Sequence, residues 1–360
     1  MVAVMSHARR IPCLDGLRGI AALVVVLYHF NGLFLPQARL PHLERAYLSV
    51  DLFFLLSGFV MAHVYGNAMA ADWRSAWPDF AIARFARLYP LFVTATLALV
   101  VIVVVFGTPQ QQSVPVSFSV AALALQPFLL QHWYVTLNWD YPSWSISTEA
   151  EAYVFFVPAA GTLISGKHSH LMAACCVAVL VILSVHETGS LASTQGLAAL
   201  LRTLPEFSLG VLLYRAHCRD TVSSRAWAAG VAVLFVLFAW LTQVDLFAIC
   251  AFACLIYYGA NAAGWFGQLL NSKPSIALGN WSYSIYLWHA PTHYAIMALF
   301  LAAGYSLDTL SKTYARMLLL ATVALVICLS AASYRYLEGP ARRFLLRAAR
   351  NGRRQKRRLA

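Results

Sequence analysis

The stretch LDGLRGIAALVVVLYHF (residues 14–30) is apolar enough to form a membrane-spanning helix, yet it contains Arg18 and His29. These residues are eleven positions apart, so on an α-helix they share one face, about 16 Å apart along the axis. An ionisable group inside hydrocarbon costs roughly 2.5 kcal/mol or more, so such groups usually serve function. The stretch predicts a spanning helix with one functional polar face. The alternative is that Arg18 pairs with Asp15 and the two polar residues stabilise the bundle.

Composition extends this interpretation to the whole chain of 360 residues, which is 61% hydrophobic and only 11% charged. Soluble domains contain about a quarter charged residues, and the mean hydropathy here is +0.67. We therefore predict an all-α fold, a polytopic transmembrane helical bundle of about ten helices. The predicted spans are 14–34, 46–66, 88–107, 143–164, 170–186, 193–215, 226–244, 246–261, 279–303 and 313–336.

The distribution of Lys and Arg predicts the orientation of this bundle. With ten spans, most of these residues between the spans fall on the side of the N-terminus, so the positive-inside rule places both termini in the cytoplasm. We divide the chain into an N-terminal segment (1–10), an integral membrane domain (11–340) and a basic tail (341–360). A further apolar segment, 113–130, would invert this charge distribution if it alone were added as a span, so we interpret it as a re-entrant or interfacial helix, or as a span whose addition is compensated elsewhere.

The charged tail and the cysteines exclude some functions. The formal charge of +12 is concentrated after the last span, where a disordered basic tail anchors to anionic lipid, and we expect no nucleic-acid partner. The seven cysteines are odd in number and lie mostly in apolar segments, so neither a disulfide framework nor a zinc site is predicted.

The segment PSWSISTEAEAY (residues 142–153) opens the fourth predicted span and carries Glu149. From the helical rise, Glu149 lies at about the depth of His29. A carboxylate bonded to an imidazole orients the ring and raises its basicity, so this pair would make a general base. The alternative is structural, with Ser143 and Ser145 as helix caps and Trp144 at the membrane interface.

Arginines stand out at two other places. Arg84 and Arg87 in RFARLYP (84–90) share a helix face at the cytoplasmic end of the third span. Paired guanidinium groups suit phosphate binding, although anchoring at the cytoplasmic surface is the alternative. Arg202, in the sixth span, is too costly in hydrocarbon to be incidental.

The segment LGNWSYSIYLWHAP (278–291) combines polar and aromatic side chains around one helix. Structural hydrogen bonds are the alternative for most of them. As substrate-binding candidates we predict Arg202, Trp144, Ser147, Asn280, Tyr283 and His289.

In their order and spacing, these motifs resemble the acyltransferase-3 family of integral membrane O-acyltransferases. The resemblance also includes DLFFLLSG (51–58), Tyr153 and YRYLEGP (334–340). It implies an integral membrane acyltransferase domain over 11–340 and catalytic roles for Arg18 and His29, with Glu149 beside them. It further implies that Arg84 and Arg87 engage the donor, together with Arg18. Some members carry an extra esterase-like domain, and we expect no relay through such a domain here.

The resemblance implies transfer of an acyl group, acetyl by preference, from acyl-CoA to a hydroxyl of a surface carbohydrate or lipid-linked glycan. His29 would act as a general base or be acylated transiently. We expect acyl-CoA, membrane lipid and the acceptor as partners, no permanently bound cofactor or metal, and a multi-pass location in a bacterial inner (plasma) membrane. The alternative function is a transporter of a small polar or anionic substrate. The acyl group, the acceptor and the oligomeric state stay open.

Overall fold

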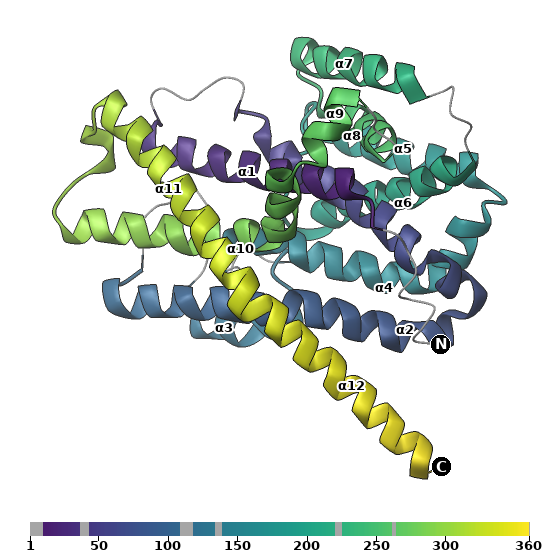
Figure 1. Cartoon of the computed structure of the whole chain (residues 1–360). Helices are drawn as coiled ribbons and strands as arrows, with labels where there is room; N and C mark the ends of the chain where they lie inside the picture. Colours follow the sequence, from purple (N-terminus) through teal and green to yellow (C-terminus); the bar gives the residue numbers. More distant parts are fainter. Residues whose placement is uncertain are drawn as a thin grey trace.

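A computed structural model describes residues 10–36, 43–108, 118–133, 139–219, 225–260 and 264–359 of the chain. This described part is built from helices and contains no β-strand (Figure 1). The helices are α1 (Pro12–Phe34), α2 (Ser49–Phe106), α3 (Val120–Leu125), α4 (Trp144–Ser165), α5 (Ser169–His186), α6 (Gly196–Arg219), α7 (Arg225–Thr242), α8 (Asp245–Gly259), α9 (Gly264–Leu270), α10 (Lys273–Ala302), α11 (Lys312–Ser333) and α12 (Gly339–Leu359). Short 3₁₀ turns, among them η3 (Ala46–Leu48), η4 (Gln126–Phe128), η6 (Tyr141–Ser143) and η8 (Leu307–Thr309), connect them, and a π-turn, η9 (Tyr334–Glu338), joins α11 to α12.

Five helical stretches of the described part are long and apolar enough to cross a membrane, and the bent pair of α8 and α9 would make a sixth. The five are Pro12–Phe34, Ala46–Phe106, Ser169–His186, Gly196–Arg219 and Lys312–Gly352. Each of the ten predicted spans falls largely on a helix. The protein is therefore an all-helical integral membrane protein, while the count of about ten spans and the cytoplasmic termini stay predictions.

Helix α2 is two arms and not one straight rod. Its backbone is non-helical at Asp72 (φ −158°, ψ 91°). Arg84 donates to the hydroxyl of Tyr65 at 3.1 Å, whereas nineteen residues of straight helix would separate them by about 28 Å. The chain thus doubles back at Asp72, whose carboxylate accepts the backbone N–H groups of Arg74 and Ser75 and so caps the second arm. The predicted spans 46–66 and 88–107 lie on these two arms.

Small residues let two helix pairs approach closely. A side chain at Gly19 would collide with the backbone of Gly279, so α1 and α10 pack backbone to backbone. In the same way Gly58 of α2 abuts the carbonyl of Phe207, and Gly210 of α6 abuts that of Leu55. Such contacts are typical of helices packed in membranes. They pack α1 against α10 and α2 against α6.

One expectation about a chain segment was wrong, and another, a re-entrant or interfacial segment 113–130, stays a prediction. The tail was expected to be disordered, but residues to Leu359 form α12, which continues from α11 and projects away from the bundle (Figure 1). Arg, Ala and Leu favour helix, and α11 supplies a nucleus from which the helix extends. Of segment 113–130, residues 118–130 include only α3 and η4, both too short to cross a bilayer. Residues 1–9 and 113–117 lie outside the described part.

Candidate functional site

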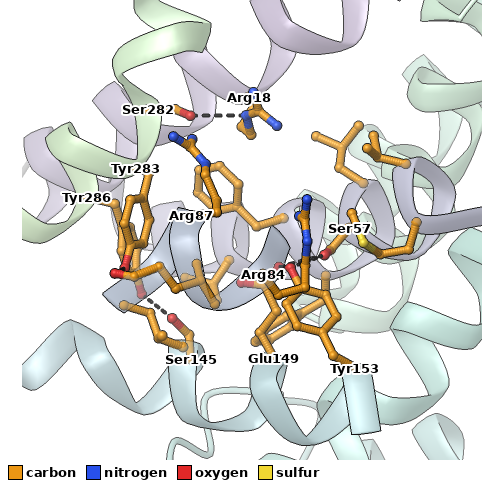
Figure 2. A pocket seen from close by; sticks show the side chains of 18 residues that line it. Arg18, Ser57, Arg84, Arg87, Ser145, Glu149, Tyr153, Ser282, Tyr283 and Tyr286 are labelled. Carbon is orange, nitrogen blue, oxygen red and sulfur yellow. Dashed lines mark hydrogen bonds between the residues drawn. The ribbon is translucent and has the colours of Figure 1, made fainter. Parts of the chain in front are cut away.

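A cavity lies at the centre of the bundle, between α1, the two arms of α2, α4 and α10 (Figure 2). It contains about 820 Å³ of empty space, part of it open to solvent. Three guanidinium groups and one carboxylate line it, those of Arg18, Arg84, Arg87 and Glu149. The structure therefore brings together the four charged residues of the predicted catalytic and donor sites, from three separate motifs.

Glu149 is fixed by two hydroxyl groups. Ser57 Oγ and the Tyr153 hydroxyl each donate to Glu149 Oε1 at 2.5 Å. The predicted pairing of Glu149 with His29 is absent from the described residues, and that expectation was wrong. Helical rise places the two residues at one depth, but Glu149 lies on the face of α4 that meets α2. The Glu149 carboxylate therefore lines the cavity and does not bond to the His29 imidazole.

Arg84 and Arg87 project from the second arm of α2 into the cavity (Figure 2). The Arg84 guanidinium lies over the rings of Tyr65 and Tyr153, at 5.3 and 5.9 Å from their centroids. Its Nε is buried and has no hydrogen-bond partner among the described residues. Arg87 donates to Glu338 at 3.0 Å and lies 5.3 Å from the Tyr283 ring. Arg84 thus keeps donor capacity free for a ligand, whereas Arg87 is partly engaged.

Arg18 is held at the edge of the cavity by α1 and α10. It donates to Asp15 at 2.9 Å, to Ser282 Oγ at 3.0 Å and to the carbonyl of Gly279 at 3.2 Å. The ion pair with Asp15, which the sequence offered as an alternative, is therefore formed. Arg18 nevertheless lines the cavity. Its ion pair with Asp15 is therefore compatible with the predicted contact to the donor.

His29 lies outside the cavity lining, in a neighbouring cluster of rings. Its ring centroid is 5.1 Å from that of His289 and 4.7 Å from that of Tyr141. His289 Nδ1 is 2.5 Å from the carbonyl oxygen of Tyr286. A carbonyl only accepts, so Nδ1 carries the proton in the neutral ring and Nε2 keeps its lone pair. This Nε2 is buried without a partner in the described part of the chain.

Tyr286 separates the cavity from the histidine cluster. Its side chain lines the cavity, and its ring centroid lies 5.7 Å from that of His289. Its hydroxyl is 2.8 Å from Ser145 Oγ and donates to the carbonyl of Pro142 at 3.0 Å. Tyr286 thus contacts both the charged cavity and the histidine cluster, and Ser145, which also lines the cavity, bonds to its hydroxyl; we call these two side chains the boundary.

Arg202 makes a buried ion pair away from the cavity. Its Nε and a terminal nitrogen donate to the two carboxylate oxygens of Asp51 at 2.7 and 2.6 Å, and the residue is 1% exposed. Its guanidinium lies 5.4 Å from the centroid of the buried Trp144 ring. These contacts engage Arg202 and Trp144 within the protein, and their predicted part in substrate binding stays a prediction.

The remaining predicted substrate residues are scattered. Tyr283 lines the cavity and donates to the carbonyl of Leu88 at 2.7 Å. Ser147 is 2.8 Å from His132 Nδ1 and also donates to a backbone carbonyl. The side-chain oxygen of Asn280, in the second turn of α10, accepts from the exposed Arg10. Of the six, only Tyr283 contributes to the cavity lining.

Several site residues escaped the sequence analysis. Ser57, Tyr153 and Glu338 stand inside recognisable motifs but received no role there. Tyr65 gave no signal, because only the reversal at Asp72 brings it to Arg84. Tyr286 lies in the quoted segment 278–291, and alternation of polar and aromatic residues does not reveal which ring forms a boundary.

The apolar helical bundle with a cation-lined cavity belongs to a known class of membrane proteins. A family model described as an acyltransferase domain matches residues 11–334. The chain is therefore a member of the acyltransferase-3 family.

Particular relatives narrow this class. The O-acetyltransferase OatA of Staphylococcus aureus is 24% identical over 94% of this chain and 58% of its own length. The putative peptidoglycan O-acetyltransferase YrhL of Bacillus subtilis is 27% identical over 79% of this chain and 49% of its own. Protein 2 in the picA locus of Rhizobium radiobacter is 48% identical, over 25% of this chain and 44% of its own. The chain spans about half the length of these relatives, and no solved structure matches it.

Proposed function

We propose that this protein is an O-acetyltransferase that moves an acetyl group from acetyl-CoA to a hydroxyl group of a surface carbohydrate or a lipid-linked glycan. Family membership supports acyl transfer, and two relatives bear the name O-acetyltransferase. We place the protein in the plasma membrane of a bacterium, with both termini in the cytoplasm.

One observation carries the assignment of the donor. Three guanidinium groups and a single carboxylate line one cavity. Coenzyme A carries several phosphate charges, and guanidinium groups bind phosphate through paired, charge-assisted hydrogen bonds. Arg84 and Arg87 would bind these phosphates, while Arg18 would hold the donor further along the cavity. An unpartnered Arg84 Nε supports this role.

The reaction would take place near the boundary formed by Tyr286 and Ser145. The acceptor oxygen attacks the thioester carbonyl carbon, the new C–O bond forms, the C–S bond breaks, and the proton of the hydroxyl ends on the departing thiol. His29 would carry that proton between the two as a general base and acid. The unpartnered Nε2 of its neighbour His289 supports a polar acceptor compartment there.

The proposal is tested with the full chain reconstituted in vesicles that contain a lipid-linked glycan and supplied with acetyl-CoA labelled in the acetyl group. We expect thioester cleavage and labelled ester on glycan, and His29→Ala should lower the rate by about 10²–10⁴-fold. His186→Ala, at an exposed histidine, is the matched control. Uptake of a solute without any thioester cleavage would overturn the proposal and favour a transporter.

A further inference from the structure

A second cavity lies between α5, α6 and α8, three helices that contact one another. It holds about 1120 Å³ of empty space, part of it open to the surroundings, and shares no lining residue with the central cavity. Most of its wall is aliphatic, from residues such as Val177, Leu180, Leu209, Leu213, Ile249 and Ala253.

One end of this second cavity is cationic. Arg215 and Arg219 of the last turns of α6 line it, together with His170 of the first turn of α5. No lining residue that the structure describes is acidic. Both arginines lie on the side that the positive-inside rule predicts to be cytoplasmic.

Arg215 and Arg219 have no acidic partner in the described part of the chain. Neither forms an ion pair among the residues that the structure describes. The Arg215 guanidinium lies against Gly166, at the left-handed end of α4 (φ 64°). Two arginines without a carboxylate nearby give this end of the cavity a positive charge, which favours an anionic ligand.

The aliphatic wall and the cationic end of the lining together indicate which class of ligand fits. A free phosphate ion would leave the aliphatic wall unused, and an uncharged lipid would leave Arg215 unpaired. Basic pockets between membrane helices on the cytoplasmic side bind anionic lipid head groups. Helix α5 also suits contact with a bilayer, since only 17% of its apolar window is buried in the protein.

We propose that the second cavity binds an anionic glycerophospholipid, with the phosphate on Arg215 and Arg219 and the acyl chains along the aliphatic wall between α5, α6 and α8. The site is independent of the proposed acetyl transfer. It is a binding site for one lipid molecule of the surrounding membrane and not a substrate channel.

Native mass spectrometry of the delipidated full-length protein tests this site with phosphatidylglycerol as the probe. We expect one bound lipid per chain, and about tenfold less for Arg215→Gln, because a charge-assisted contact is lost. Lys167→Gln removes a nearby exposed cation that does not line the cavity and should leave binding unchanged.

A second variant keeps the test decisive if Arg215→Gln does not fold. Ala253→Phe fills the aliphatic part without removing a cation, and it should also reduce lipid binding. Equal retention of phosphatidylcholine and phosphatidylglycerol would overturn the proposal. So would phosphatidylglycerol binding that survives in a folded Arg215→Gln variant, or competition by millimolar inorganic phosphate that removes the lipid completely.

Discussion

The bundle holds its arginines in two contrasting environments. Arg202 is sealed, with both carboxylate oxygens of Asp51 bound and 1% of the residue exposed. Arg84 lines an open cavity with its Nε unbonded and with no ion pair among the described residues. Both are arginines in apolar sequence, and both are expensive to place there. The cost of burial is therefore no guide to the role of an arginine. The hydrogen-bond and ion-pair partners distinguish an arginine that is engaged within the protein from one that is available to a ligand.

The largest expected effect is on stability, at the sealed pair. Arg202→Gln leaves the buried Asp51 carboxylate without its cation, which costs about 3–5 kcal/mol. We expect a much lower thermal unfolding midpoint of the purified protein, and partial recovery in Asp51→Asn/Arg202→Gln. If Arg202→Gln has the unfolding midpoint of the wild type but loses acetyl transfer, Arg202 is a functional residue like Arg84, and the contrast between the two arginines is wrong.

A smaller loss of stability is expected where α2 meets α6, the two helices that carry the sealed pair. A methyl group at Gly58 would meet the carbonyl of Phe207, so Gly58→Ala must push the helices apart, at about 1–3 kcal/mol. Gly161→Ala, where no atom lies within 4 Å of the added carbon, is the control. Comparing their unfolding midpoints checks this close approach, and equal midpoints would refute it.

At the central cavity we expect a substitution to change the binding of the acetyl donor more than the stability of the protein. Arg87→Gln removes one cation from the lining and should raise the KM for acetyl-CoA about tenfold, equivalent to roughly 1.4 kcal/mol, with kcat changed less. Steady-state kinetics at varied acetyl-CoA measures this change. Arg316→Gln, at an exposed cation of α11, should leave KM unaltered. A loss of kcat at constant KM would indicate that Arg87 acts in the chemical step and not in binding of the donor.

The smallest effect is expected at Tyr286, at the boundary between the central cavity and the histidine cluster. Tyr286→Phe keeps the ring beside His289 but removes the hydroxyl bonded to Ser145 and Pro142, a change of about 0.5–1.5 kcal/mol. We expect a severalfold change in kcat with the KM for acetyl-CoA preserved. A rise of that KM alone would place Tyr286 within the donor site and not at its edge.

The elements were predictable because apolar stretches of this length have few alternatives in a membrane. Arg18 was predictable because a cation inside hydrocarbon is costly, and Arg84 and Arg87 were predictable because two arginines three residues apart share one helix face. Contacts were harder, since Asp51 is 151 residues from Arg202 and helical rise gives the depth of Glu149 but not its face. The reversal at Asp72, which brings Tyr65 to Arg84, also depends on tertiary packing that no local pattern records.

The π-turn Tyr334–Glu338 has a consequence for chain length. It inserts a wide turn between α11 and α12 and leaves Glu338 facing inward, where it binds Arg87 and accepts from Ser284. Each residue of a helix turns the chain by about 100°. Deleting one residue here would therefore rotate Glu338 and all of α12 about the helix axis and release Arg87. The angular phase of the C-terminal helix and the charge of the central cavity are thus coupled through five residues.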